Sequence, residues 1–119
     1  MRTGAVCAIG VYCPMRFIET PIFTACVRKH LDAESYRALQ LALVLRPEQG
    51  ALIRGGAGLR KLRWGAEGRG KRGGVRTIYY WAVDEAVCVM LYMFSKNEQG
   101  DLTQKQLSEL ARLVREEFK

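Results

Sequence analysis

Lys61, Arg63 and Arg76 are the side chains of this 119-residue sequence whose types and spacing point most directly to chemistry. Lys61 and Arg63 are two positions apart, so on a β-strand they project from the same face. Three aromatic residues, 79–81, follow Arg76 closely. Because cations hold phosphates while neighbouring aromatic rings stack on bases, the pattern indicates a surface for a polyanion, and nucleic acid is the first partner to consider.

The net positive charge is confined to one segment of the chain. Residues 54–76 hold eight basic side chains and one acidic one, whereas the other 96 residues hold eleven of each. The eight are Arg54, Arg60, Lys61, Arg63, Arg69, Lys71, Arg72 and Arg76. The whole formal charge of +7 therefore belongs to this segment, which favours binding of a polyanion with release of counterions. A basic loop that serves only solubility is the alternative interpretation of such a cluster.

Length and cysteine usage indicate a single cytoplasmic domain without a metal or cofactor. At 119 residues the chain is long enough to bury one core. The cysteines form no CxxC pair, and His30 falls on an expected helix without a nearby ligand partner, so we expect reduced thiols and no metal site. No run approaches the roughly 18 apolar residues of a membrane span.

The first fourteen residues are small and apolar but follow no useful periodicity. They half match a secretory signal, with a basic residue before a short apolar run. Met15, however, opens the string MRFIETPIFT, which reads directly as a strand followed by a capped helix. We therefore expect residues 1–14 to be a non-native or disordered extension and residues 15–119 to be the domain.

The positions of turn and capping residues predict the order of the elements. A short strand at 16–19 precedes Thr20, an N-cap residue followed by proline at the first helical position. Asp32 can cap a second helix, which Pro47 ends at Arg46. The expected inward residues of this helical hairpin are Ile22, Phe23, Cys26 and Val27, then Tyr36, Leu39 and Leu43, widened by Ala38, Leu41, Val44 and Leu45.

Three strands and a helix follow. Alternation puts Lys61 and Arg63 on one face of a strand at 59–64, a glycine-rich hairpin tip leads to a strand at 75–83, and the apolar run 87–95 is typical of a central strand. Thr103 and Gln106 form a capping box for the last helix.

This order predicts an α+β fold. We expect an antiparallel sheet of about four strands, with the N-terminal helical hairpin and the C-terminal helix packed on one face. The other face then stays open, and Lys61, Arg63 and Arg76 converge there.

Three strings of the sequence resemble the HigB branch of the RelE/ParE superfamily of type II toxin–antitoxin toxins. They are GLRKLRW, KRGGVRTIYYW and FSKNEQGDLT, separated by a glycine-rich basic hairpin, and the resemblance covers residues 15–118. It implies a small α+β toxin that enters the ribosomal A site and cleaves mRNA during translation. It also implies a HigA-like helix-turn-helix antitoxin as partner, with operator DNA contacted only through the complex.

The resemblance also implies roles for individual residues. RNA cleavage without a metal needs a proton removed from the ribose 2′-hydroxyl, stabilisation of charge on the phosphate and protonation of the leaving oxygen. Arg76 matches the strand-borne catalytic arginine of the family, Lys61 and Arg63 would position the phosphate, and Lys96 matches a basic position after the last strand. The residues expected to bind RNA are Arg60, Arg69, Lys71, Arg72, Tyr80 and Tyr92.

The sequence departs from the best-known RelE members at two places. Asn97 stands where they carry an arginine, and residues 101–103 hold no tyrosine. Tyr80 and Tyr92 are the substitutes that the strand pattern offers, and the identity of the general acid and base stays open. Two other functions remain as alternatives: a non-catalytic nucleic-acid-binding protein, with affinity that falls with salt, and a ParE-like inhibitor of DNA gyrase.

Overall fold

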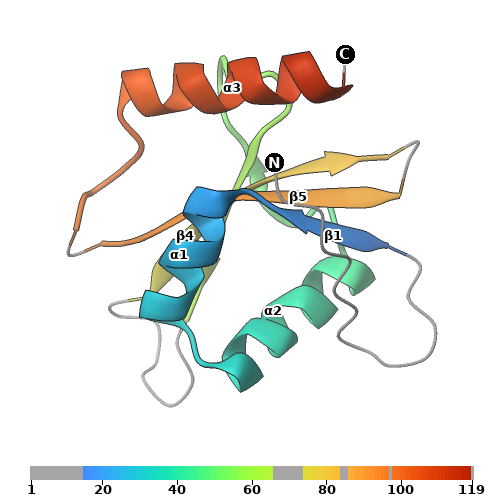
Figure 1. Cartoon of the computed structure of the whole chain (residues 1–119), viewed down its shortest axis with the longest axis vertical. Helices are drawn as coiled ribbons and strands as arrows, with labels where there is room; N and C mark the ends of the chain where they lie inside the picture. The colour runs from blue at the N-terminus through green and yellow to red at the C-terminus, as the bar shows by residue number, and fades with distance from the viewer. Residues whose placement is uncertain (1–14, 66–73, 84–85, 97, 119) are drawn as a thin grey trace.

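The fold is an α+β sandwich built on one five-stranded sheet (Figure 1). The computed structural model describes residues 15–65, 74–83, 86–96 and 98–118, so the extension expected at 1–14 and the tip of the basic hairpin lie outside the described residues. Along the chain the elements are β1 (Arg16–Glu19), α1 (Pro21–His30), α2 (Ala33–Leu45), β2 (Ala51–Leu52), β3 (Arg60–Trp64), β4 (Val75–Ala82), β5 (Val87–Ser95) and α3 (Gln104–Phe118).

The strands lie in the order β1-β5-β4-β3-β2. Strands β2 to β5 form an antiparallel meander, and β1 joins the outer edge of β5 in parallel. The predicted α+β class and the predicted strands are confirmed. The fifth strand, β2, lies between the second helix and the strand expected at 59–64, a segment for which the sequence pattern predicted no element.

The helices cover both faces of the sheet, and this corrects the predicted arrangement. Phe23 of α1 and Leu39 of α2 pack in one cluster with Tyr79, whereas Leu107 of α3 packs with Ile78 in a second cluster. Ile78 and Tyr79 are neighbours on β4, so their side chains point to opposite faces. Figure 1 accordingly shows the sheet between α3 and α2. The prediction that all helices pack on one face was wrong, and the cationic face is not open along its whole length.

Helix starts follow the capping signals of the sequence. The side chains of Thr20 and Asp32 each accept a hydrogen bond from the amide three residues ahead, and Thr103 and Gln106 close the predicted capping box before α3. Four apolar side chains expected to point inward are instead exposed: Ile22, Ala38, Leu41 and Leu45. Within the described residues, no helix is long and apolar enough to cross a membrane.

A β-bulge at Leu91 changes which residues of β5 share a face. Ile78 pairs with Tyr92 and Tyr79 pairs with Met90, so Leu91 is the extra residue between two consecutive pairs. Leu91 and Tyr92 both pack in the cluster on the α3 side. From the bulge onward, the alternation along β5 is therefore shifted by one, and Tyr92 joins the face that carries α3.

Candidate nucleic-acid interface

The structure brings three of the predicted cations together on the α3 side of the sheet. Arg63 and Arg76 are direct cross-strand partners, and Lys61 pairs with Ile78, the next residue along β4 on that face. Side chains directly opposite each other on an antiparallel pair have Cβ atoms about 5 Å apart, and like charges there repel. The surface formed by Lys61, Arg63 and Arg76, here called the cation cluster, therefore needs a neighbouring negative charge.

Asp101 supplies a negative charge beside this cluster. Its Oδ1 lies 3.0 Å from Lys61 Nζ and accepts a second hydrogen bond, 2.8 Å long, from the backbone N–H of Leu102. The hydrogen bond from Lys61 is the main reason that the pKa of Asp101 lies below its usual value, and the positive charge of Arg76 acts in the same direction. In the sequence, residues 101–103 were notable only because they hold no tyrosine, so the carboxylate of Asp101 was not predicted as part of the site.

Arg76 retains an unused hydrogen-bond donor. The residue is half-buried, and its Nη1 atom is shielded from solvent without a hydrogen-bond partner among the described residues. A buried donor without a partner typically costs about 1–3 kcal/mol. Arg76 therefore keeps this nitrogen without a partner among the described residues at a cost to the folded protein.

The loop that carries Asp101 is fastened to the start of α3. The side-chain amide of Gln99 donates to the carbonyl of Asp101 at 2.7 Å and to Oε1 of Gln106 at 2.9 Å. The same Oε1 accepts the N–H of Thr103 in the capping box. Asp101 is thus held in place by the residues that begin α3.

The other end of this loop is fastened to α1. Oε1 of Glu98 accepts the backbone N–H of Ser95 at 3.0 Å and lies 3.1 Å from Nε2 of His30, with Lys29 at the edge of ion-pair distance. The Ser95 amide, and then the charges of His30 and Lys29, lower the pKa of Glu98. His30 therefore has a structural partner, and the described residues contain no group of side chains suited to hold a metal ion.

Of the two expected tyrosines, Tyr92 lies closer to Arg76. It pairs with Ile78, which places it diagonally from Arg76, at a Cα separation of roughly 7–8 Å. Its hydroxyl donates to Oε1 of Gln99 at 3.3 Å, and burial raises its pKa above the ordinary value for tyrosine. Tyr80 shares this face but lies four residues along β4, roughly 13 Å from Arg76.

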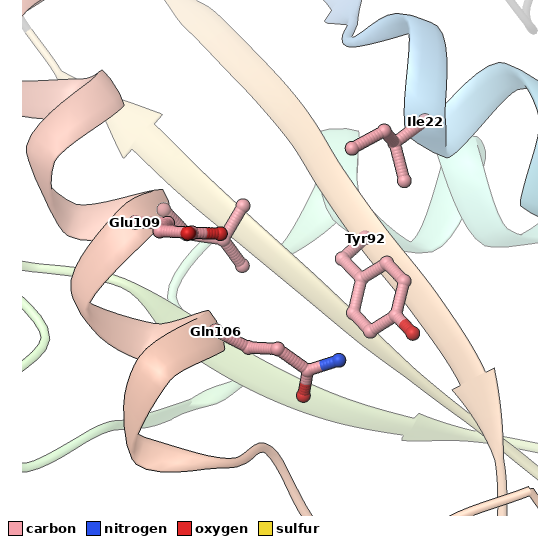
Figure 2. Close-up of a pocket in the computed structure, with 5 residues that line it drawn as sticks. Ile22, Tyr92, Gln106 and Glu109 are labelled. Atoms are coloured by element: carbon pink, nitrogen blue, oxygen red, sulfur yellow. The ribbon is translucent and has the colours of Figure 1, made fainter.

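Tyr92 also borders an open groove of about 310 Å³ between α1 and α3. Figure 2 shows Gln106 reaching from α3 toward the Tyr92 ring, with Ile22 of α1 across from them. Leu110 and Glu109 complete the lining. The groove is mostly apolar and lies beside the cation cluster, not within it.

A model described as the RelE toxin of the RelE/RelB toxin–antitoxin system matches residues 15–119. The chain belongs to the RelE toxin family. Among solved structures, a mutant of the E. coli toxin RelE in the free state matches with a TM-score of 0.56 and 16% sequence identity, covering 82% of this chain and 95% of that one. At this identity the match shows a shared RelE fold. As a RelE toxin, the chain has an antitoxin as its partner.

Of the remaining predicted residues of this RelE toxin, Arg60 lies apart from the cation cluster, Lys96 lies near Arg76, and three lie outside the described residues. Arg60 pairs with Tyr79 and so lies on the opposite face, where its Nη1 donates to the carbonyls of Glu48 and Gly50 at 2.9 and 2.8 Å. Lys96 is exposed and follows β5 directly, at the end of the sheet nearest Arg76. The predicted RNA-binding residues Arg69, Lys71 and Arg72 lie outside the described residues.

Proposed function

We propose that this RelE toxin is a ribosome-dependent endoribonuclease of the HigB branch, which acts in the cytoplasm and inhibits translation by cleaving mRNA in the A site. One observation carries the proposal. Lys61, Arg63 and Arg76 share one face of the sheet, and Arg76 holds a donor without a partner among the described residues. Three cations with an unused donor suit the negative charge of an RNA backbone.

The proposed reaction is a metal-independent attack by the ribose 2′-oxygen on the adjacent phosphorus. The O2′–P bond forms while the P–O5′ bond breaks, giving a 2′,3′-cyclic phosphate and a 5′-hydroxyl end; the proton of the 2′-hydroxyl passes to solvent water or to a basic group, and the leaving 5′-oxygen takes up a proton. Negative charge increases on the non-bridging oxygens as the reaction proceeds, and we propose that Arg76 stabilises it, because a guanidinium stays charged and presents several donors. Lys61 and Arg63 hold the phosphate in position.

Proton transfer is assigned to residues at the same end of the sheet. Tyr92, which like any tyrosine with a pKa near or above 10 is protonated at neutral pH, is proposed to give a proton to the leaving 5′-oxygen. Lys96 follows the end of β5 and is proposed as a further catalytic cation. Arg69, Lys71 and Arg72, which lie outside the described residues, are proposed to bind ribosomal RNA or message.

The antitoxin is proposed to be a HigA-like protein with a helix-turn-helix domain. The toxin would then reach operator DNA only through the complex. The resemblance of the chain to HigB toxins supports this proposal.

The test is primer extension on a defined message incubated with purified protein, with and without translating ribosomes. The parent is compared with Arg76→Ala and with Arg16→Ala, which removes an exposed strand arginine at the other end of the sheet. We expect cuts that need ribosomes, survive in Arg16→Ala and fall at least about 100-fold in Arg76→Ala, the range for loss of one charge-stabilising donor.

Other outcomes would replace the proposal. Equal cutting by parent and Arg76→Ala would remove Arg76 from the mechanism. Intact message together with salt-dependent RNA binding would favour a non-catalytic nucleic-acid-binding protein. Intact message together with inhibition of DNA supercoiling would favour a ParE-like gyrase inhibitor.

A further inference from the structure

The cation cluster already holds one anionic group, the carboxylate of Asp101. We propose that Lys61 and Arg76 form a binding site for a phosphate, and that the carboxylate of Asp101 occupies this site in the free protein. A phosphate that binds there displaces the carboxylate from Lys61. The identification of that phosphate as part of RNA rests on the proposed function. The exchange itself requires only a phosphate group and the residues described above.

The carboxylate fills this position incompletely. Oδ1 of Asp101 is shared between Lys61 Nζ, at 3.0 Å, and the Leu102 N–H, at 2.8 Å. Arg76 is close enough for its charge to act on Asp101, yet its buried Nη1 has no hydrogen-bond partner among the described residues. A phosphate has more acceptor oxygens than a carboxylate, in a tetrahedral arrangement, and can therefore serve Lys61 and Arg76 together.

The contact between Lys61 and Asp101 is of the kind that exchanges easily. The side chain of Lys61 is 35% exposed and that of Asp101 is 65% exposed. Ion pairs that are this open to water are weak, because each charge keeps much of its hydration and salt screens the attraction. A phosphate that engages both cations can therefore displace the carboxylate.

Asp101 keeps another hydrogen-bond partner when it no longer contacts Lys61. Its loop is fixed by Gln99 and Gln106 just before α3, and its Oδ1 already accepts the Leu102 N–H. The start of a helix presents free N–H groups and partial positive charge, which stabilise a carboxylate there. The carboxylate can leave the cluster without losing all of its partners, while its negative charge keeps opposing a phosphate nearby.

The experiment is an NMR titration of the ¹⁵N-labelled full chain with inorganic phosphate, compared across variants. Asp101→Asn keeps an oxygen that can accept the Lys61 and Leu102 hydrogen bonds but removes the competing charge. The matched control is Glu116→Gln, which makes the same change in net charge at an exposed ion pair on α3. The backbone amide of Leu102 reports on the position of Oδ1, and amides of β3 and β4 report on the cation cluster.

We expect saturable phosphate binding in the parent that moves the Leu102 amide, roughly 3- to 10-fold tighter binding in Asp101→Asn and unchanged binding in Glu116→Gln. Lys61→Ala and Arg76→Ala should abolish binding. Unchanged or weaker binding in Asp101→Asn, or no saturable binding in any variant, would overturn the inference. Asp101→Ser serves as a second variant if the asparagine variant fails to fold.

The same titration separates this inference from the proposed function. If phosphate exchanges as expected but the ribosome assay shows intact message, the anion site stands and the nuclease proposal fails. If message is cut but Asp101→Asn leaves phosphate binding unchanged, the nuclease proposal stands and the role of Asp101 falls.

Discussion

Thr20 and Leu91 are 71 positions apart in the chain, yet Thr20 Oγ1 donates a 2.9 Å hydrogen bond to the carbonyl of Leu91. The same oxygen accepts the N–H of Phe23 at 3.0 Å and so caps α1. Leu91 is the extra residue of the bulge in β5. The buried hydroxyl of Thr20 therefore connects the start of α1 to the β-bulge at Leu91, which places Tyr92 on the same face as the cation cluster.

Thr20→Val should remove both hydrogen bonds while nearly keeping the shape of the side chain. We expect a loss of about 1–3 kcal/mol in the free energy of unfolding, because a helix cap is lost and a buried carbonyl is left unpaired. Denaturant unfolding measures this loss. Thr20→Ser, which keeps the hydroxyl, should lose much less, and equal losses in both variants would show that the methyl group matters more.

Tyr92→Phe should reduce message cleavage by roughly 100-fold or more while leaving RNA binding intact, because only the proposed proton donor is removed. Tyr80→Phe is the matched control, since it removes a tyrosine hydroxyl from the same face four residues from Arg76 along β4. Single-turnover cleavage on programmed ribosomes measures the rate. Equal rates in the two variants would exclude Tyr92 as the acid.

Glu98 should make the stability of the protein sensitive to acid. In the folded protein the pKa of Glu98 lies below its ordinary value of 4.5, mainly because the Ser95 amide donates to it. As the pH falls, the unfolded chain therefore binds a proton at Glu98 more readily than the folded protein does. The contribution of Glu98 is therefore fully present above about pH 4.5 and is lost as the pH drops through the lower folded value. When the free energy of unfolding is measured from pH 7 to pH 3, the stability difference between the parent and Glu98→Gln should shrink. A difference that stays constant over this range would contradict a contribution from the charge of Glu98.

Arg60→Ala should affect stability more than cleavage. Its Nη1 joins β3 to the carbonyls of Glu48 and Gly50, and this loop is also held by the hydroxyl of Tyr79, which accepts the Gly50 N–H and donates to Pro47. Truncation should cost about 1 kcal/mol, given that the guanidinium is partly exposed. Cleavage by the folded variant should stay near that of the parent. A large loss of cleavage without a loss of stability would instead support the RNA-binding role that the family resemblance implies for Arg60.

The sequence was informative where the controlling interactions are local. Each helix begins at the capping residue that the sequence identified, because a cap involves residues three apart. The face of β3 that carries Lys61 and Arg63 follows from simple alternation, and the structure agrees. The cation cluster was therefore predictable from strand periodicity and from the resemblance to a toxin family.

The rest depended on contacts between distant residues. The apolar stripe of α3 shows that the helix packs but not on which face. The uninterrupted apolar run of β5, 87–95, was the available signal, because a strand covered on both faces loses its alternation. The bulge at Leu91 and the contact of Asp101 with Lys61 are set by tertiary structure, so periodicity and spacing carried no sign of them.

The parallel pairing of β1 with β5 has a consequence for how the toxin acquires its structure. Arg16 lies beside Val87 and Glu19 beside Met90, so the strand that is synthesised first must wait for the last strand before it can join the sheet. Closing so long a loop is entropically unfavourable, whereas the β3–β5 meander joins neighbours in the chain. We expect the meander to form first and β1 with α1 to dock late. A nascent chain still short of β5 would thus hold its first strand unpaired.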